Sequence, residues 1–356
     1  MKNFKKYKKF WANKEVFITG HTGFKGTWLG IILNILKANI HGYALKPEKN
    51  SLFIKSKLLK SFKTNTFANI NDLDLLKKKL IKVKPSILIH LAAQPLVIES
   101  YKNPKKTFET NIIGTLNVLE AAREVKTLKS IIIVTTDKVY KIKKKSKVYV
   151  ENDELWGTDP YSASKVGAEI VTHSYLNSFF IKKKFNCKIA TVRAGNVLGG
   201  GDFSENRIIP DIYKAIKNKN NLVLRNPNYI RPWQHVIDPL MGYLKLAQTQ
   251  FYYKKKLDNR WNFGPNKKSF KKVIDVVNFM KKKNKFKFKI KKNFKINETK
   301  VLKLNNLNAK AKLSWKPIWN FKDTLIKVEE WHDLLDKGAE PRKICEKQFF
   351  EYLKQE

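Results

Sequence analysis

The sequence has little cysteine, no long apolar run and few acidic residues. Only two of its 356 residues are cysteines, Cys187 and Cys345, which argues against a disulfide framework or a cysteine-rich metal site. Its most apolar segments are short and flanked by lysine, which excludes a typical membrane-spanning helix. The N-terminus is basic, but no apolar stretch with a small-residue cleavage site follows it, so we expect a cytoplasmic protein.

The shortage of acidic residues leaves a large positive charge. The chain has 73 lysines and arginines but only 30 aspartates and glutamates, which gives a formal net charge of +43. Such a charge is typical of nucleic-acid binding proteins. Lysine greatly outnumbers arginine, however, and the lysine runs at 77–79, 141–147 and 281–292 carry no zinc-finger or RNA-recognition framework. We therefore expect a solvated basic surface and no nucleic-acid partner, although the charge can steer an anionic substrate toward the protein.

The order of apolar segments predicts the fold class. Apolar residues make up 42% of the chain, which is typical of a folded globular protein with one large or two modest domains. Strand-like segments alternate with helical patterns in the first half. The predicted strands are 16–19, 40–45, 86–91, 130–135 and 188–193, and the predicted helices are 26–37, 71–82, 104–123 and 161–180. This alternation indicates an α/β fold with a doubly wound parallel sheet, the Rossmann fold.

After residue 194 the pattern changes to a glycine-rich loop and shorter, lysine-rich segments. We expect residues 1–193 to form the Rossmann domain, with segments near 233–263 returning to it. Residues 194–356 should form most of a smaller, interleaved α/β domain that binds the substrate.

Residues 19–26 read Thr-Gly-His-Thr-Gly-Phe-Lys-Gly, directly after a predicted strand and at the start of a predicted helix. Gly20, Gly23 and Gly26 allow a tight turn, a close approach of the backbone to a pyrophosphate, and close packing of the helix on the sheet. Phosphate then lies at the positive end of the helix dipole. The segment therefore predicts a dinucleotide site.

Tyr161 and Lys165 are four residues apart, so they share one face of a predicted helix. A lysine ammonium beside a phenol lowers its pKa from the ordinary value of about 10, and the phenolate can then take a proton from a sugar hydroxyl. Thr136, Asp137 and Lys138 follow a predicted buried strand, at the sheet edge where doubly wound folds bind ligands. Taken alone, the pair is also compatible with a half-buried tyrosine beside a surface lysine.

Together these motifs resemble those of the extended short-chain dehydrogenase/reductases, the NAD-dependent epimerase/dehydratase family, and more narrowly the CDP-glucose 4,6-dehydratases. The resemblance extends over about residues 11–265. It rests on TGHTGFKGTWL (19–29), HLAAQPLV (90–97), VTTDK (134–138), DPYSASK (159–165), RAGNVLGGGD (193–202) and RPWQHV (231–236). It implies a nucleotide-sugar-binding second domain, NAD as the cofactor and CDP-glucose as the substrate.

The resemblance also implies a reaction, the conversion of CDP-glucose to CDP-4-dehydro-6-deoxyglucose for deoxysugar and surface-polysaccharide synthesis. Tyr161, helped by Thr136, would remove the proton of the carbon-4 hydroxyl while hydride passes to NAD. Asp137, with a pKa raised by burial, would protonate the departing carbon-6 hydroxyl. Lys138, in its neutral form, would take the carbon-5 proton before the hydride returns to carbon 6.

Further binding residues follow from the same resemblance. The implied cofactor contacts, besides Tyr161 and Lys165, are Gly20, Gly23, Phe24, Lys25, Gly26, Asn69, Ile70, Leu91, Ala92, Ala93 and Thr110. The implied substrate contacts are Gln94, Asn196, Arg207 and Arg231, with Arg231 gripping the diphosphate as a fork. No metal is expected. The second predicted strand lacks a following acidic residue for an NAD ribose and has Lys46 nearby, so NADP stays an alternative.

Several readings stay open on the sequence. Asn111 is a candidate for a structural amide bridging two strands, and Trp233 and His235 are candidates for either packing or binding. Residues 141–158 depart from the family pattern beside the expected sugar pocket. The alternative functions are another nucleotide-sugar 4,6-dehydratase, a 4-epimerase, or a non-enzymatic dinucleotide-sensing module. Because the helices at 104–123 and 161–180 resemble those of a four-helix dimer contact, we expect a homodimer or homotetramer.

Overall fold

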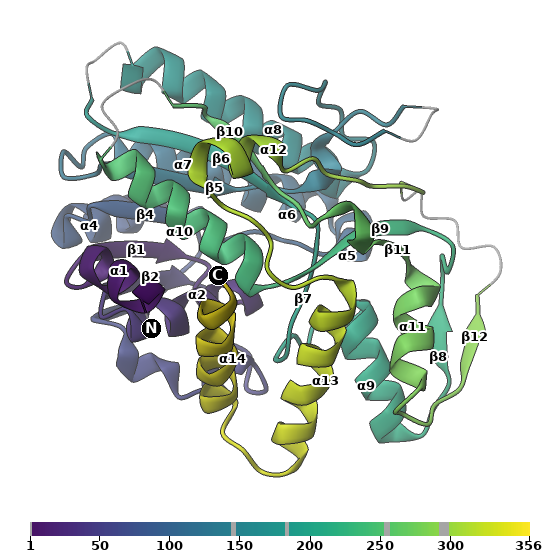
Figure 1. Cartoon of the computed structure of the whole chain (residues 1–356). Helices are drawn as coiled ribbons and strands as arrows, with labels where there is room; N and C mark the ends of the chain where they lie inside the picture. Colours follow the sequence, from purple (N-terminus) through teal and green to yellow (C-terminus); the bar gives the residue numbers. More distant parts are fainter. Residues whose placement is uncertain (1, 144–146, 182–184, 253–256, 292–298) are drawn as a thin grey trace.

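The computed structural model describes residues 2–143, 147–181, 185–252, 257–291 and 299–356. Its main sheet has seven parallel strands in the order β10-β6-β5-β4-β1-β2-β3 (Figure 1). The bounds are β1 (Glu15–Thr19), β2 (Asn39–Ala44), β3 (Thr64–Phe67), β4 (Ile87–His90), β5 (Ser130–Val134), β6 (Lys188–Ala194) and β10 (Arg260–Phe263). The strand order reverses beside β1, which defines a doubly wound sheet. The predicted fold class is confirmed.

Helices cover both faces of this sheet (Figure 1). One face carries α1 (Lys2–Trp11), α2 (Phe24–Ile35), α10 (Ile237–Tyr252) and α14 (Pro341–Gln355). The opposite face carries α4 (Leu73–Val83), α7 (Gly114–Ala122) and the end of the α8 (Pro160–Tyr175) segment. Neighbouring residues of β1 alternate between the two cores, since Val16 and Ile18 belong to the first and Phe17 to the second. The sheet is therefore buried on both faces, as parallel sheets generally are.

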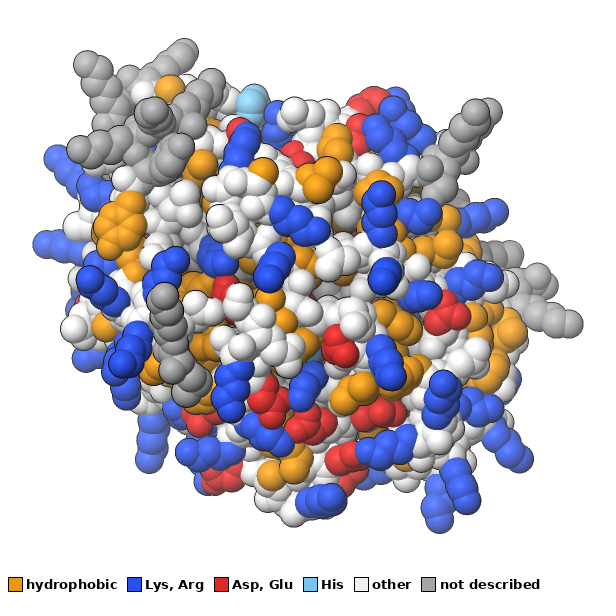
Figure 2. Space-filling view, viewed as in Figure 1, with side chains coloured by type: hydrophobic (Ala, Val, Ile, Leu, Met, Phe, Trp, Pro, Cys, Tyr) orange, Lys and Arg blue, Asp and Glu red, His pale blue; other side chains and the backbone are white. Residues whose placement is uncertain are grey.

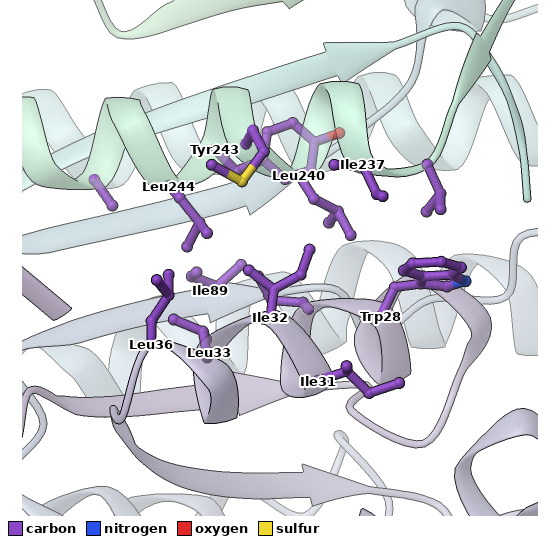
Figure 3. Packing of buried hydrophobic residues seen from close by; sticks show 14 of the residues in the cluster. Trp28, Ile31, Ile32, Leu33, Leu36, Ile89, Ile237, Leu240, Tyr243 and Leu244 are labelled. Carbon is purple, nitrogen blue, oxygen red and sulfur yellow. The ribbon is translucent and has the colours of Figure 1, made fainter. Parts of the chain in front are cut away.

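The packing of α2 fixes the loop that precedes it. Figure 3 shows α2 facing α10 across the first core, with Ile89 of β4 beside them. The labelled side chains of this core, all fully buried, are Trp28, Ile31, Ile32 and Leu33 of α2, Leu36 directly after it, and Ile237, Leu240, Tyr243 and Leu244 of α10. Trp28 also donates from Nε1 to the carbonyl oxygen of Gly200 at 3.0 Å. Because α2 begins in the glycine loop, this packing holds the loop against the sheet.

Two small sheets form a lobe beside the main sheet (Figure 1). The first has the order β11-β9-β7, and the second pairs β8 with β12 in parallel. Their bounds are β7 (Asn196–Leu198), β8 (Leu222–Leu224), β9 (Ile230–His235), β11 (Phe270–Lys272) and β12 (Phe288–Ile290). The helices α9 (Ile208–Asn218), α11 (Val273–Lys281) and α13 (Phe321–Asp336) share a separate apolar core with β7, β8, β9 and β12.

The second half of the chain also reaches back to the first. β10 lies at one edge of the main sheet, and α14 packs on α2, where Arg342 donates to Asn34 Oδ1 at 2.6 Å. The domain division at residue 193 stays a prediction.

Two predicted long helices contain π-helical turns. The first consists of α6 (Pro104–Phe108), a π turn at Glu109–Ile113, and α7, while α8 continues into a π turn at Leu176–Ile181. Such turns are frequent at functional sites. The remaining helices of the described chain are α3 (Leu52–Lys55), α5 (Val97–Lys102) and α12 (Leu307–Leu313), besides short 3₁₀ turns.

Lysine and arginine side chains are spread over the face shown in Figure 2 and alternate with apolar and acidic side chains. They form no single stripe on this face. Within the described ranges, none of the helices has the length and apolar character needed to cross a membrane.

Candidate active site

A cavity of about 1220 Å³ opens at the carboxyl ends of the central strands. Its lining includes residues that directly follow β1, β2, β4, β5 and β6, and its other wall comes from the smaller lobe. Sites for one small ligand typically occupy about 300–1000 Å³. The cavity therefore has room for two ligands at the point where the strand order reverses.

All but one of the predicted site residues line this cavity. They are Gly20, Gly23, Phe24, Lys25, Gly26, Asn69, Ile70, Leu91, Ala92, Ala93, Thr110, Thr136, Asp137, Lys138, Tyr161, Lys165, Asn196, Arg207 and Arg231. The fold thus gathers residues from the glycine loop, the β4 and β5 ends, α8 and the smaller lobe at one place.

Gln94 is the exception, because its side chain is used inside the protein. Its Nε2 donates to Thr107 Oγ1 at 2.9 Å and to the Leu96 carbonyl at 3.1 Å, and its Oε1 accepts from the Leu96 backbone amide at 2.6 Å. The side chain therefore shapes the loop after β4, and the structure does not bring it to the cavity wall.

The glycine loop makes a turn that tolerates no side chain at two positions. Gly20 has φ +73°, and a Cβ there would lie 2.5 Å from the amide nitrogen of Ala92. A Cβ on Gly26 would lie 2.2 Å from the Gly20 carbonyl oxygen. The helix α2 starts directly afterwards, and its N-cap Gly23 provides no capping side chain. The first residues of α2 line the cavity, and their amides lack a capping side chain, so this helix start is suited to hold an anion.

Tyr161 lies in the first turn of α8, which Asp159 caps by accepting from the Ser162 amide at 3.0 Å. Burial raises the pKa of Tyr161 to about 12, although a hydrogen bond with Thr136 opposes the shift. Lys165 instead donates from Nζ to the Val134 carbonyl at 3.1 Å. The net pKa of the phenol is therefore raised and not lowered as expected, since desolvation outweighs Thr136 and Arg207, which act to lower it.

Lys25 and Lys165 both have pKa values lowered to about 8. Burial is the main cause for each. Arg207 lowers the pKa of Lys25 further and Asp137 opposes it, while Lys25 lowers that of Lys165 and Glu169 opposes it. Lys25 of the glycine loop therefore interacts electrostatically with Asp137, which follows β5, and with Lys165 of α8.

Asp137 is a buried carboxyl with one unsatisfied oxygen. Its Oδ1 accepts from Thr136 Oγ1 at 3.2 Å, and its buried Oδ2 has no hydrogen-bond partner in the described structure. Burial raises the pKa of Asp137 even though Lys138, Arg231 and Lys25 act to lower it. The predicted direction of this pKa shift is confirmed, and a carboxyl that keeps its proton can act as a donor.

Arginines line the cavity on the side of the smaller lobe. Arg207 pairs with Asp202 Oδ2 at 2.9 Å. Arg231 is buried and donates to the Thr299 carbonyl at 2.7 Å, with its guanidinium 5.3 Å from the centre of the Tyr229 ring. Arg225, which the sequence analysis did not assign, lies in the same wall. This positive wall suits a diphosphate.

The wall after β2 carries both signs of charge. Tyr43 donates to the carbonyl of Asn69 at 3.0 Å and so fixes the segment expected to flank an adenine. Lys46 and Glu48 both line the cavity beyond β2.

Within the described parts of the chain, no cluster of histidine, cysteine and carboxylate side chains is suited to hold a metal ion.

The structure decides the readings of Asn111 and His235, whereas that of Trp233 stays a prediction. Asn111 is a structural amide, but it joins a loop and a helix, since its Nδ2 donates to the Gln94 carbonyl at 3.1 Å and to Ser164 Oγ at 2.8 Å. His235 packs edge-on against Trp28 and Trp319. Trp233 lines the cavity and is held by a hydrogen bond to the Lys271 carbonyl.

The segment 141–158 does not contribute to the cavity wall in its described part. Instead Tyr149 stacks on Tyr140 at 4.9 Å and bridges to Leu304, which places the segment beside the end of the turn Asp137–Val139. Residues 144–146, in the middle of the lysine run, lie outside the described residues.

Comparison with known proteins agrees with this geometry. Residues 17–328 match the family described as GDP-mannose 4,6 dehydratase. The chain is 39% identical over 346 residues to a CDP-glucose 4,6-dehydratase of Salmonella typhimurium, with 96% of each chain covered.

Two solved structures share the fold. MoeE5 in complex with UDP-glucuronic acid and NAD has a TM-score of 0.76 and 19% identity over 89% of this chain and 98% of its own. The dTDP-glucose 4,6-dehydratase of Bacillus anthracis in complex with NAD has a TM-score of 0.73 and 19% identity, covering 92% and 99%. With the family match extending over most of its length, the chain belongs to the GDP-mannose 4,6-dehydratase family of extended short-chain dehydrogenase/reductases.

Proposed function

We propose that the protein is an NAD-dependent CDP-glucose 4,6-dehydratase that forms CDP-4-dehydro-6-deoxyglucose. The observation that carries the proposal is the placement of Tyr161, Thr136, Asp137 and Lys138 around one cavity with the glycine loop. The relative that bears this activity in its name is 39% identical over 96% of the chain, and it supports the choice of nucleotide.

The residues of the cavity fit NAD. The uncapped start of α2 and the turn at Gly20 leave backbone amides for a pyrophosphate, and Lys25 adds positive charge beside them. Asn69 and Ile70 would flank the adenine, and Leu91, Ala92, Ala93 and Thr110 would line the nicotinamide side. When bound, NAD supplies an acceptor for the carbon-4 hydride and returns that hydride to carbon 6. We prefer it to NADP because Glu48 accompanies Lys46 beyond β2 and would repel a 2′-phosphate.

Tyr161 is the proposed base for the carbon-4 hydroxyl. Its hydrogen bond with Thr136 offers a path for the proton and opposes the pKa shift caused by burial. Lys165 contributes its charge while it keeps its proton, below its pKa of about 8. The resulting 4-ketone makes the proton on carbon 5 more acidic, which prepares the elimination of water.

Asp137 and Lys138 are the proposed elimination pair. Asp137 would protonate the carbon-6 hydroxyl as it departs, which agrees with its raised pKa and its unsatisfied buried oxygen. Lys138, the next residue, would take the proton from carbon 5. These two residues favour a dehydratase over a 4-epimerase, because an epimerase needs the Tyr–Lys pair but no proton donor for a leaving hydroxyl.

The sugar nucleotide would occupy the side of the smaller lobe. Arg231 is held by backbone carbonyls and lines the cavity, and Arg207 lies in the same wall. We assign the diphosphate to these arginines and the hexose to the space near Asn196. Gln94 acts in this proposal by holding the loop after β4.

The direct test is incubation of the purified protein with CDP-glucose and NAD, followed by mass spectrometry of the nucleotide sugar. The proposed function predicts a product lighter by one water. A product of unchanged mass indicates an epimerase. Water loss only from another nucleotide sugar would show that this sugar, and not CDP-glucose, is the substrate. If no nucleotide glucose is converted to a product, the proposal that the protein is an enzyme of this kind is contradicted.

We also propose a homodimer or larger homo-oligomer. The faces of the α6–α7 and α8 segments carry exposed apolar side chains, with Ile113 45% and Ile170 61% exposed. Light scattering that shows only monomer at assay concentration would contradict this. A cytoplasmic location and a role in surface-polysaccharide synthesis stay predictions.

A further inference from the structure

Behind the cavity, Glu169 and Arg193 form a buried ion pair. Glu169 lies one helical turn beyond Lys165 on α8, and Arg193 lies in β6. Arg193 donates from Nε to Glu169 Oε1 and from Nη2 to Oε2, each at 2.8 Å. The side chains of Arg193 and Glu169 are 0% and 2% exposed. Desolvation of both charges is costly, so such a pair persists only with excellent geometry and satisfied polar atoms.

Two threonine hydroxyls complete the coordination of the carboxylate. Thr135 Oγ1 donates to Glu169 Oε1 at 2.6 Å, and Thr191 Oγ1 donates to Oε2 at 2.7 Å. Thr135 immediately precedes the catalytic Thr136, whereas Thr191 lies within β6 away from the cavity wall. The same carboxylate therefore holds one residue beside the proposed chemistry and one residue remote from it.

The guanidinium reaches the other end of the catalytic segment. Arg193 donates from Nη1 to the Tyr140 hydroxyl at 2.8 Å, and Tyr140 donates onward to Asn262 Oδ1 of β10 at 2.6 Å. Tyr140 directly follows the 3₁₀ turn Asp137–Val139. The ion pair is thus bonded to Thr135 on one side of the catalytic segment and to Tyr140 on the other.

We propose that Glu169 and Arg193 are positioning residues that hold Thr136, Asp137 and Lys138 against α8 by fixing both ends of their segment. This inference rests on the proposed function, which assigns the catalytic roles. Neither residue of the pair lines the cavity, so both act through their neighbours.

The charge of Glu169 has a second effect, on Lys165. Burial would raise the pKa of Glu169, but Arg193 lowers it and keeps the carboxylate ionised. That negative charge raises the pKa of Lys165, against burial and Lys25, which lower it. Among the titratable groups close to Lys165 are Lys25 from α2, His90 from β4, and Tyr161 and Glu169 from its own helix. Loss of the Glu169 charge should therefore make Lys165 lose its proton at lower pH.

A matched pair of variants tests the positioning role. Thr135→Val and Thr191→Val each replace one hydroxyl on the same carboxylate with a methyl group. Because misplacement of a catalytic group costs up to about 10²-fold in rate, we expect Thr135→Val to lower kcat about tenfold with little change in KM. Thr191→Val should leave kcat within about twofold of the wild type at a similar cost in thermal stability. Equal kcat values for the two variants would overturn the proposal.

Glu169→Gln adds a readout that a purely structural role would not change. The variant should lower kcat and shift the alkaline limb of the pH profile of kcat/KM to lower pH, whereas Thr135→Val should leave the limb in place. If Glu169→Gln folds and the alkaline limb of its pH profile does not shift, the proposed effect of the Glu169 charge on Lys165 is contradicted. If the variant does not fold, the threonine pair still decides the positioning role.

Hydrogen exchange without substrate separates this inference from the proposed function. Wild-type protein that forms no water-loss product contradicts the proposed function alone. Backbone amides of residues 135–140 should exchange faster in Thr135→Val than in both Thr191→Val and the wild type. Exchange at the same rate in all three proteins would show that the ion pair does not hold the catalytic segment.

Discussion

Two buried polar clusters lie one helical turn apart on α8 and differ in how their atoms are satisfied. Around Tyr161 and Lys165, Asp137 keeps a buried oxygen without a partner in the described structure, and pKa values depart in both directions from their usual range. Around Glu169, each carboxylate oxygen accepts two hydrogen bonds. Unsatisfied polar groups are costly, so their location indicates where a ligand is expected. The satisfied cluster serves instead as the support.

The largest expected effect comes from the unsatisfied cluster. Tyr161→Phe removes the proposed base without changing the shape of the side chain, so we expect kcat to fall by about 10²–10⁴-fold or more. Binding of NAD, followed by fluorescence or calorimetry, should change much less. A Tyr161→Phe protein with wild-type turnover would show that Tyr161 is not the base, and that the two clusters do not differ in their roles as proposed.

Asp137→Asn tests the second catalytic role. The amide cannot donate a proton in the same way, so the formation of the water-loss product should fall by roughly 10²–10⁴-fold. Oxidation at carbon 4 should be less affected, and the 4-ketone should therefore accumulate, which chemical reduction with a deuterated borohydride and mass spectrometry can detect. Equal losses in both steps would assign Asp137 to substrate orientation.

The pH dependence should report Lys165. Its ammonium favours the phenolate of Tyr161, and its pKa is lowered to about 8 by burial and by Lys25. Since the charged form is present below this pKa, kcat/KM should fall as the pH rises through about 8. A profile of kcat/KM that keeps rising well above the pKa of Lys165 would contradict this role.

Gly20→Ala tests the glycine loop. A Cβ would lie 2.5 Å from the Ala92 amide nitrogen on a backbone with φ +73°, so the loop must shift. We expect weaker NAD binding and a lower melting temperature, with a loss of stability of order 1–3 kcal/mol. Gly338→Ala is a matched control, because Gly338 also has positive φ but a Cβ there meets nothing within 4 Å. Similar effects on NAD binding in both variants would contradict the assignment of the loop.

The smallest effect on activity is expected at Gln94. Gln94→Ala leaves the Leu96 amide and Thr107 with lost hydrogen bonds, which should cost roughly 1–3 kcal/mol of stability. Because the side chain is not part of the cavity wall, KM for the sugar nucleotide should change little. A large increase in KM without a loss of stability would restore the sequence-based assignment of Gln94 to the substrate.

Much of the Rossmann half could be predicted because its signals are local. Apolar runs gave the strands β1, β4 and β5, and the helix predicted at 71–82 is α4, which Asp72 caps by accepting from the Leu75 amide at 3.1 Å. The N-terminal helix α1 was missed because its sequence is dominated by lysine. Its Phe4 packs on the distant Phe350, with ring centres 5.5 Å apart.

At the site, the sequence could identify residue types but not their burial. The family strings placed Tyr161, Lys165 and Asp137 correctly in one cavity, yet the direction of the Tyr161 pKa shift depends on desolvation in the folded chain. The role of Gln94 also depends on the direction of its side chain, which bonds to Leu96 and Thr107 inside the protein. The sequence analysis missed the ion pair of Glu169 and Arg193, because these residues meet only after α8 packs beside β6.

The most direct test of the central account follows the carbon-4 hydrogen of CDP-glucose. If Tyr161 and its neighbours carry out an oxidation that is reversed within one turnover, CDP-glucose deuterated at carbon 4 should give a dehydrated product with deuterium at carbon 6. Nuclear magnetic resonance of the product locates the label. Deuterium retained at carbon 4 of a product of unchanged mass, or lost to solvent, would contradict the account.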